Sequence, residues 1–468
     1  MLNYKLKIAL VPERRWLPGP KRTGIFNSDY AVANKEKAIR FLKDHFADAD
    51  TEFVDLEWLN EEGLLIETKD CEKVADYLKE QKVDAMFIIN CNFGNEEAAG
   101  KIAQLMKVPV LLWGPRDRII EKNGTRYTDT QCGLFSISKQ LKRYNVPFSF
   151  IKNCDVEDPA FSEGFQRFLS VACMVKNFAK LRILQVGSRV KPFKCVMANE
   201  LELTEKFGID VVPVNLAETG KRLNALLEEK KEAVQKQVDE IKKLYDVSDI
   251  AEADLAKMGA FVEFFKDILA DNMGDVIATE CWTAMTHLIG VLPCLSMSIL
   301  ADQGYIAICE TDIHGAITSA LLSCAVRGKR PPFFGEFTVR HPEKEDVELL
   351  WHCGVFAGSL RKDTCKTRLF LNKPDFCAKD GKYTIARFQA EKGKYYLLGG
   401  EFETAEGPLT QGTYLWARFK NLDAVERKLI EGPYIHHMSE IEGSYAETLR
   451  EFAKFVPDLI FDPLEEIQ

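Results

Sequence analysis

Residues 305–326 of the chain have the sequence YIAICETDIHGAITSALLSCAV. The apolar run up to Glu310 has the length of a buried strand, and Asp312 and Gly315 then lead into a helical pattern that reaches Val326. A buried strand that leads directly into a helix is the repeating unit of a parallel sheet. This stretch therefore predicts an α/β fold for the part of the chain around it.

The same alternation of apolar runs and helical patterns occurs twice before this point. From residue 6 it predicts strands at residues 6–11, 51–56, 85–90 and 108–113, with helices at residues 34–45, 71–80 and 96–106. From residue 181 it predicts a strand and loop at residues 181–188, strands at 209–214 and 275–282, and helices at 195–207, 221–245 and 251–271. We therefore predict two doubly wound α/β domains, each with a parallel sheet.

The pattern changes after the segment GKRPP at residues 328–332, because helical periodicity largely disappears and short β-like runs replace it. These runs predict strands at residues 333–340, 383–389, 395–402 and 413–419, and a last helix at residues 445–455. An antiparallel β-rich, barrel-like domain therefore follows the two α/β domains. At about 150 residues per domain, the chain divides into predicted domains at residues 1–175, 176–328 and 329–468.

The composition excludes several classes of protein. Lys and Arg number 62 against 71 Asp and Glu, a net charge of −9, so we expect no nucleic-acid partner. The longest apolar stretch, residues 288–301, is shorter than a membrane span, and residues 1–12 lack the apolar core of a secretory signal. The thirteen cysteines contain no CxxC pair and suit a reducing compartment. We therefore expect a cytoplasmic protein with no membrane partner, whose thiols serve as small apolar residues.

Three histidines of the β-rich part occur in apolar or turn settings, where an imidazole requires a partner. They are His352 in the segment LLWHCG, and His436 and His437 in the segment GPYIHHM. The other four histidines suit structural roles. These three are therefore the candidates for chemistry.

Acidic residues occur at similarly apolar places. Glu280 and Glu310 each end an apolar strand, and Glu336 lies in the segment PPFFGEF. A carboxylate buried there must pair, take up a proton or bind a metal, although a strand-end cap or a salt bridge is the alternative for each. Two carboxylates with two or three imidazoles form a mixed oxygen and nitrogen donor set. Such a set suits a divalent ion such as Mn²⁺, whereas a zinc site of the thiolate type would need cysteine ligands.

Several of these segments together match a known family. They are AICETDIHGAITSA at residues 307–320, FFGEF at 333–337, WHCG at 351–354, GPYIHH at 432–437 and GSYAET at 443–448. With these motifs the chain resembles the L-fucose isomerase and L-arabinose isomerase superfamily, specifically from about residue 280 to residue 445. The resemblance implies the same order of two α/β domains and a β-rich domain, a Mn²⁺ cofactor with Co²⁺ or Mg²⁺ as alternatives, and a homo-oligomer, usually a hexamer.

The resemblance also implies roles for individual residues. Glu310 and Glu336 match the two acidic residues that bind the metal and move a proton between C1 and C2 of an open-chain sugar by a cis-enediol mechanism. His437 matches the metal-binding histidine, with His436 as the adjacent alternative. His352 matches the additional histidine of the arabinose branch. An aldose–ketose isomerase is therefore the implied activity, with a preference for alkaline pH because histidine ligands must be deprotonated.

The sugar is less defined than the metal site. We expect Asn92, Phe93, Trp351 and His436 to contact it, and Trp282 is a further aromatic candidate. The loop after residue 90 has no tryptophan where the fucose enzymes have one, so the specificity differs from theirs.

Two alternatives follow. One is a divergent isomerase of an unusual or anionic sugar. Basic residues near the N-terminus would bind the negative charge of that sugar; they are Arg14, Arg15, Lys21 and Arg22. The alternative for these residues is a solvated loop without a ligand. The other is a non-catalytic sugar-binding protein with the same fold.

Overall fold

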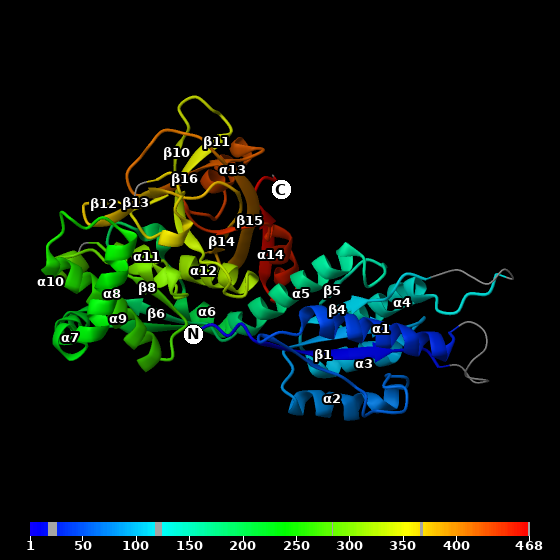
Figure 1. Ribbon diagram of the computed structural model, residues 1–468. Coiled ribbons are helices and arrows are strands. Elements are labelled where there is room, and N and C mark those ends of the chain that lie inside the picture. Colours follow the sequence, from blue (N-terminus) through cyan, green and yellow to red (C-terminus); the bar gives the residue numbers. More distant parts are fainter. Residues whose placement is uncertain (17–25, 118–123, 283, 366–367, 467–468) are drawn as a thin grey trace. The chain divides into compact units, whose positions relative to one another are not determined.

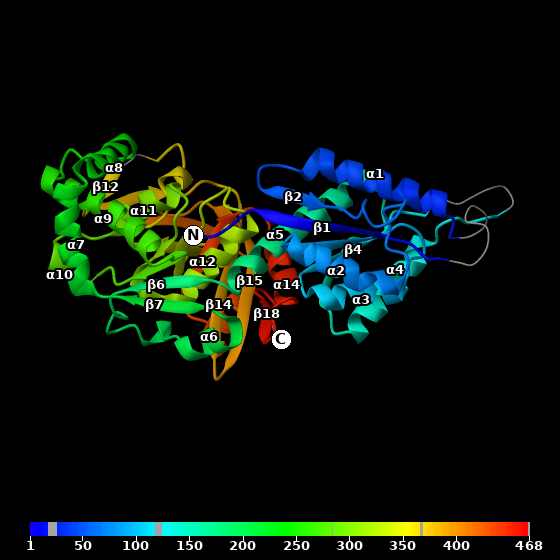
Figure 2. The ribbon, with the colours of Figure 1, turned by 90° about the horizontal axis from the view of Figure 1, so that it is seen from below.

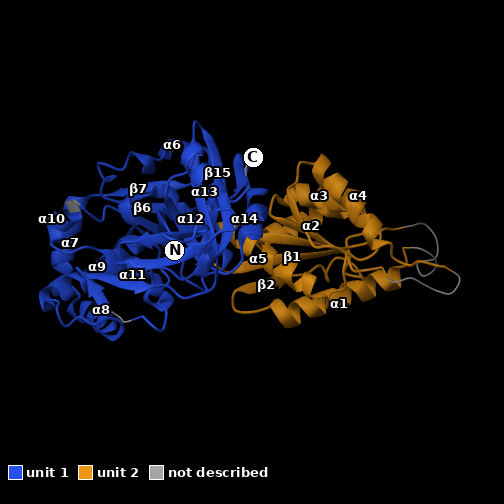
Figure 3. Cartoon of the chain, turned by 90° about the horizontal axis from the view of Figure 1, so that it is seen from above, with its two compact units in different colours: residues 1–3, 177–468 blue, residues 4–176 orange. Residues whose placement is uncertain are grey.

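The computed structural model of the chain describes residues 1–16, 26–117, 124–282, 284–365 and 368–466 (Figure 1). The chain forms two compact units (Figure 3). The N-terminal unit comprises residues 4–176, and the C-terminal unit comprises residues 1–3 and 177–468. The predicted division into three domains stays a prediction.

The N-terminal unit is built on a five-stranded parallel sheet. Its strand order is β2-β1-β3-β4-β5. The strands are β1 (Leu6–Glu13), β2 (Thr51–Val54), β3 (Ala85–Asn90), β4 (Val110–Trp113) and β5 (Phe148–Phe150). β3 and β4 are buried along their whole length, as expected for strands with helices on both faces. The edge strand β5 was not predicted.

Five helices cover this sheet. They are α1 (Ser28–Phe46), α2 (Cys71–Glu80), α3 (Glu96–Met106), α4 (Thr130–Arg143) and α5 (Pro159–Phe178). Phe161 of α5 packs against Phe41 of α1 and Phe87 of β3, with ring centroids 5.7 and 6.2 Å away. Aliphatic residues of α2, α3 and α4 form a core on the other face. Figure 2 shows α1 on one side of β1 and α2 and α3 on the other, so the sheet is doubly wound as predicted.

The C-terminal unit contains a second parallel sheet, in the order β7-β6-β8-β9. Its strands are β6 (Arg182–Val186), β7 (Asp210–Val214), β8 (Val276–Thr279) and β9 (Ala307–Ile308). Its helices are α6 (Glu200–Phe207), α7 (Leu216–Glu229), α8 (Lys231–Leu244), α9 (Glu252–Asp271), α10 (Ala284–Ile289), α11 (Cys294–Asp302) and α12 (Ile313–Ala325). The single helix predicted at residues 221–245 is two helices, because the backbone leaves helical geometry at Lys230.

The β-rich part of the C-terminal unit is a closed six-stranded antiparallel barrel. Its strands pair in the order β16-β11-β10-β17-β14-β15, and β15 pairs again with β16. They are β10 (Phe333–Arg340), β11 (Val347–His352), β14 (Lys382–Glu391), β15 (Lys394–Ala405), β16 (Thr413–Arg418) and β17 (His437–Glu442). The outer strands β12 (Arg368–Phe370), β13 (Lys373–Cys377) and β18 (Leu459–Pro463), and the helices α13 (Leu422–Glu431) and α14 (Ala446–Ala453), complete this part. The predicted fold class is confirmed.

The strands β11 and β17 and the helix α13 were missed by the sequence analysis. β17 carries Ser439 and Glu440 in its centre, and both are buried, so its composition is not that of an apolar run. β11 begins with alternating apolar and acidic residues and is short. These strands matter because they carry His437 and His352.

Helix α12 determines where the candidate site lies. All of its residues are buried, because it packs against β6 and β8 of the second sheet and against β14 and β17 of the barrel (Figure 1). A helix that is apolar all round is buried on every side. Its N-terminus therefore lies where the sheet and the barrel meet.

Among the helices of the described residues, none is both long and apolar enough to cross a membrane.

Candidate metal centre

Glu310 is held in a strained turn between β9 and α12. Residues Cys309–Thr311 form one 3₁₀ turn in which Glu310 (φ 65°) and Thr311 (φ 55°) are left-handed. Left-handed backbone is unfavourable for residues other than glycine, and such strain is concentrated at functional sites. Trp282 donates from its indole Nε1 to Glu310 Oε1 at 3.1 Å, and Asp312 caps α12 by accepting the Gly315 backbone N–H at 2.9 Å. The turn and the indole together fix the Glu310 carboxylate.

Glu336 and His437 are neighbours across two barrel strands. The antiparallel register of β10 and β17 pairs Glu336 with His437. His437 Nε2 lies 3.1 Å from Glu310 Oε2 and 3.7 Å from Glu336 Oε2, so one imidazole nitrogen meets both carboxylates. The His437 side chain is fully buried, whereas 12% of the Glu310 and 19% of the Glu336 side chain is exposed. The cluster is therefore accessible to solvent at its two carboxylates.

His437 is oriented by a buried carboxylate. Its Nδ1 donates to Asp312 Oδ2 at 3.0 Å, and Asp312 also accepts two hydrogen bonds from Arg387, at 2.5 and 3.0 Å. Burial opposes the charge of Asp312, but Arg387 and His437 outweigh it and hold the pKa of this carboxyl well below its usual range. Burial likewise opposes the charge of His437, but its contacts with Asp312 and Glu310 raise the pKa of the imidazole above its usual value. Nε2 is thus the nitrogen left to bind a ligand.

Arg387 was missed by the sequence analysis. It lies in β14 within the segment YTIARFQ, and its side chain is fully buried. The signal was a cation in the middle of an apolar strand, which requires a buried acidic partner. That partner is Asp312.

His352 lies at the end of β11 with its two nitrogens in different surroundings. Nε2 has no hydrogen-bond partner among the described residues and lies within 4.8 Å of ligand atoms of Glu310 and His437. Nδ1 accepts the Cys353 backbone N–H at 2.9 Å and lies 3.3 Å from Cys353 Sγ. A neutral ring that accepts this bond carries its proton on Nε2, so ligation through Nε2 would require that proton to shift to Nδ1 and the backbone bond to break.

His436 lies on the more exposed side of the cluster. Its Nε2 is 3.5 Å from Glu336 Oε2, and 40% of its side chain is exposed. Burial and the neighbouring His437 lower the pKa of His436 to about 4, so the ring is neutral near neutral pH. The Phe193 ring packs edge-on against both histidines, with centroids 6.2 and 6.0 Å away, and closes that side of the cluster.

Glu280 and Trp351 have contacts elsewhere. Glu280 Oε2 accepts the Ser188 backbone N–H at 3.0 Å, so this carboxylate supports the loop after β6. Trp351 donates its indole N–H to the Gln411 carbonyl oxygen and packs on the apolar cluster of β11 and β16. Its ring stacks at 6.1 Å from the His352 ring. Trp351 is also the cross-strand partner of Glu336 in β10, so it adjoins the cluster at both residues.

Asn92 and Phe93 belong to the N-terminal unit, whereas the cluster belongs to the C-terminal unit. Asn92 is buried, and its Oδ1 accepts backbone N–H groups of Arg15 and Gly94 at 2.8 and 3.0 Å. The Arg15 guanidinium lies 4.2 Å from the centre of the Phe93 ring. Both residues thus shape the loop after β3.

The basic residues near the N-terminus are partly neutralised. Arg14 donates to both oxygens of Glu62, at 2.6 and 3.0 Å, and Arg15 pairs with Glu96. Lys21 and Arg22 lie outside the described residues.

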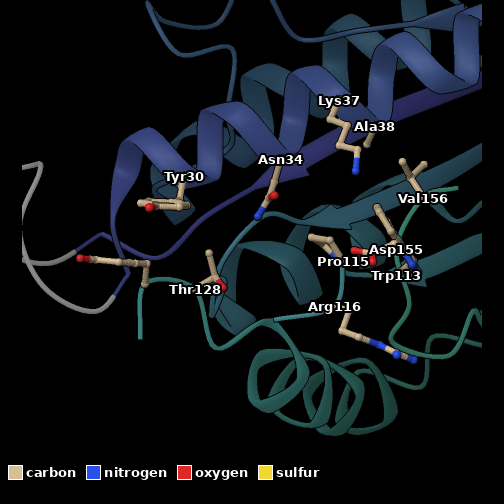
Figure 4. A pocket seen from close by; sticks show the side chains of 11 residues that line it. Tyr30, Asn34, Lys37, Ala38, Trp113, Pro115, Arg116, Thr128, Asp155 and Val156 are labelled. Atoms are coloured by element: carbon tan, nitrogen blue, oxygen red, sulfur yellow. The ribbon is translucent and has the colours of Figure 1, made fainter. Parts of the chain in front are cut away.

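A cavity of about 130 Å³ opens in the N-terminal unit beyond the ends of β4 and β5 (Figure 4). It is lined by Tyr30, Asn34, Lys37, Ala38, Trp113, Pro115, Arg116, Tyr127, Thr128, Asp155 and Val156. The Tyr30 and Tyr127 rings stack at 4.7 Å, and Asn34 donates to the Cys91 carbonyl oxygen in the loop after β3. Ligands bind at this edge of parallel sheets, so the cavity is a second candidate site.

The donor set fits a divalent metal. Glu310 Oε2, His352 Nε2 and His437 Nε2 are buried and have no partner with hydrogen-bond geometry in the part of the chain that the structure describes. Ligand atoms converge in two overlapping groups, Glu310 with His352 and His437, and Glu336 with His436 and His437, each within 4.8 Å. Carboxylate oxygens with imidazole nitrogens suit Mn²⁺ and similar divalent ions.

The chain is similar to known sugar isomerases. Residues 20–179 match the N-terminal domain of the family described as fucose/sulfoquinovose isomerase. The chain is 24% identical to the sulfoquinovose isomerases of Priestia aryabhattai and Priestia megaterium over 444 residues, which cover 92% of this chain and 95% of each relative. The sulfoquinovose isomerase of Alkalicoccus urumqiensis is 24% identical over 384 residues, which cover 79% of this chain and 84% of that relative.

These matches show what the chain is similar to. Its residues 20–179 match the fucose/sulfoquinovose isomerase family, and nearly its whole length is similar to sulfoquinovose isomerases. This likeness suggests an aldose–ketose isomerase whose substrate is a sugar.

Proposed function

We propose that the chain is a divalent-metal-dependent isomerase that interconverts an open-chain aldose and its ketose by a cis-enediol mechanism. One observation carries this proposal: the Glu310 and Glu336 carboxylates converge on Nε2 of His437, whose other nitrogen donates to Asp312. A histidine held by a carboxylate and facing further carboxylates is a typical metal ligand. The likeness of the chain to this family supports the same reaction class.

Glu310, Glu336 and His437 would hold the metal, with His352 as the fourth ligand. Mn²⁺ suits this set, with Co²⁺ or Mg²⁺ as alternatives. A bound divalent ion supplies Lewis-acid polarisation of the sugar oxygens at C1 and C2. A binding protein without turnover would not require acidic groups beside these histidines, so we favour an enzyme.

Glu336 is the residue that we assign to proton transfer between C1 and C2. Burial, opposed by His352 and His437, raises the pKa of Glu336, so its carboxylate is a stronger base than an exposed one. Glu310 faces the same space and is the second acid–base group, fixed by the Trp282 indole. A positioned acid or base contributes about 10²–10⁴-fold in rate. His436, neutral because burial lowers its pKa to about 4, would accept or donate a hydrogen bond to a sugar hydroxyl.

An anionic sugar is the substrate class that we infer. The relatives are named for sulfoquinovose, a sulfonated sugar. In this chain the loop after β6 carries three cations, Arg189, Lys191 and Lys194, and its Phe193 contacts the two histidines of the site. Arg189 donates to the Val190, Lys191 and Phe193 carbonyl oxygens at 3.3, 3.4 and 2.9 Å, which holds its guanidinium against this loop. A sulfonate on the far end of the substrate would be bound by this loop.

The first experiment measures bound metal and ketose formation for the wild type and for Glu310→Ala, over a panel of aldoses that includes sulfoquinovose, with Mn²⁺ added. We expect close to one divalent ion per chain, turnover that EDTA abolishes, and loss of both in the variant. Glu348→Gln is the matched control, because Glu348 is a half-buried acid on β11 away from the cluster. A wild type that binds no divalent ion contradicts the proposal and favours the sugar-binding alternative.

The substrate class has its own test. Arg189→Met should raise KM for the sulfonated sugar about 10-fold or more while leaving a neutral aldose unaffected, since a charge-assisted hydrogen bond is worth about 1.5–3 kcal/mol. Equal effects on both sugars would show that this loop does not bind the anionic group.

The hexamer expected from the family resemblance is tested separately by light scattering of the purified chain.

A further inference from the structure

Four cysteine thiols, three of them buried, lie beside the candidate metal centre. Cys281 follows β8, Cys294 begins α11, Cys309 starts the strained turn after β9, and Cys353 follows β11. The first three are 2% exposed or less, and Cys353 is half-buried. Four different elements therefore bring four sulfur atoms to one place in the C-terminal unit, with no CxxC spacing in the sequence to show it.

Two of these sulfur atoms are in direct contact, and the others lie close to them. Cys294 Sγ lies 3.4 Å from Cys353 Sγ. The Cys309 thiol interacts with the thiols of Cys281, Cys294 and Cys353. Ligand atoms of Cys309, Cys353 and His352 all lie within 4.8 Å of one another. In a tetrahedral zinc site with Zn–S bonds of about 2.3 Å, sulfur atoms are about 3.8 Å apart, so the Cys294 and Cys353 pair would need only a small expansion to share an ion.

We propose that Cys281, Cys294, Cys309 and Cys353 bind a thiophilic divalent ion, Zn²⁺, at a second site behind the carboxylate and histidine cluster. Thiolates select such ions, whereas the carboxylate-rich cluster selects harder ones. The two sites are adjacent, because Cys309 precedes Glu310 and the Cys353 sulfur lies 3.3 Å from His352 Nδ1.

The site would act as a structural clamp. Bonds to one ion would tie together the start of α11, the turn after β9 and the end of β11. The clamp would hold Glu310 in its left-handed conformation and would keep the Cys353 sulfur beside His352 Nδ1.

The test uses the full chain, stripped of metal, reduced and titrated with Co²⁺. Cobalt bound by thiolates gives a sulfur-to-metal charge-transfer absorption, which carboxylate and histidine ligands do not give. We expect this absorption at about one equivalent of Co²⁺ per chain, its displacement by Zn²⁺, and its loss in Cys294→Ser/Cys309→Ser. Cys71→Ser is the matched control, because Cys71 is a buried thiol of the N-terminal unit. Glu336→Gln should retain the absorption, which separates this site from the proposed catalytic one.

A second measurement does not depend on the folding of a variant. Alkylation of the wild type, followed by peptide mapping, should show that Zn²⁺ protects these four cysteines and leaves Cys132 and Cys195, which are exposed, unprotected. Absence of the charge-transfer absorption in the wild type, its persistence in the double variant, or unprotected thiols in the presence of Zn²⁺ would each overturn the proposal. So would isolation of the chain with a Cys294–Cys353 disulfide.

Discussion

Asp312 Oδ2 lies 3.0 Å from Nδ1 of His437, and both side chains are fully buried. The carboxylate holds the proton of the ring on Nδ1, so the lone pair of Nε2 faces Glu310 and Glu336. Asp312 also caps α12, which packs between the second sheet and the barrel. The orientation of the His437 ring therefore depends on where that helix begins.

Asp312→Asn should weaken metal binding about 10–100-fold, the usual effect of losing the acceptor behind a ligating histidine. The amide would leave the ring free to adopt the other tautomer. The affinity is measured by competition with a chelating dye. Asp375→Asn is the control, since Asp375 is a buried acid paired with Arg368 away from the site. Equal affinities for Asp312→Asn and the wild type would show that Asp312 does not orient His437.

Arg387→Met should lower the free energy of unfolding by about 3–5 kcal/mol, because it leaves the Asp312 carboxylate buried without its cation. Urea denaturation measures this change. Arg418→Met removes a half-exposed partner of Asp346 and should cost about 1 kcal/mol or less. A similarly small loss of unfolding free energy in both variants would show that the buried Arg387–Asp312 pair contributes little to stability.

Glu13 should make stability depend on pH. Burial, opposed by the Asn95 backbone N–H, raises its pKa to about 8, above about 4.3 in the unfolded chain. The folded chain therefore retains a proton that the unfolded chain releases. Its contribution to stability is complete below about pH 4.3 and is lost as pH rises through about 8, at up to about 1.4 kcal/mol per pH unit.

Glu13→Gln tests this, because an amide cannot ionise. The melting temperature of this variant should fall less than that of the wild type between pH 5 and pH 9. Glu97→Gln, at an exposed residue of α3, should follow the wild type. Parallel curves for wild type and Glu13→Gln would mean that Glu13 is ionised in the folded chain throughout this range.

Metal affinity should fall in acid. The pKa values of His437 and Glu336 are both raised, and both groups must lose a proton to bind the ion. Below the pKa of His437, affinity should fall about 10-fold per pH unit for each proton displaced. Titration with Mn²⁺ or Co²⁺ at pH 6 and pH 8 measures the difference. His436→Asn should keep this dependence, since His436 is neutral at both pH values.

Saturating Mn²⁺ should stabilise the chain. At about 100 times the dissociation constant, a ligand that binds only the folded state adds about 2.7 kcal/mol. Thermal unfolding should therefore shift upward with Mn²⁺ and return with EDTA. His437→Ala should abolish the shift, whereas His45→Ala, at an exposed residue of α1, should retain it. A shift that survives in His437→Ala would place the ion elsewhere.

The sequence predicted the buried strands of both parallel sheets well, because a strand covered on both faces is a continuous apolar run. It did not predict β11 and β17, which carry His352 and His437, since buried polar residues such as Glu440 interrupt their apolar character. The residues of the candidate site were nevertheless named from local motifs and family resemblance. Such a motif is defined by residue types and their spacing within one continuous segment, so it can be found without knowledge of the fold.

The partners of those residues were decided by the tertiary structure. Glu336 faces His437 because of the register of β10 and β17, and Asp312 meets Arg387 because α12 packs on β14. Glu280 looked equivalent to Glu310 in sequence, yet it binds Ser188 and supports a loop. By itself the sequence indicated which runs are apolar and which side chains can carry charge or bind metal. Only the fold decided which of them meet, because those contacts join elements far apart in the chain, and hydrophobic periodicity carries no information about them.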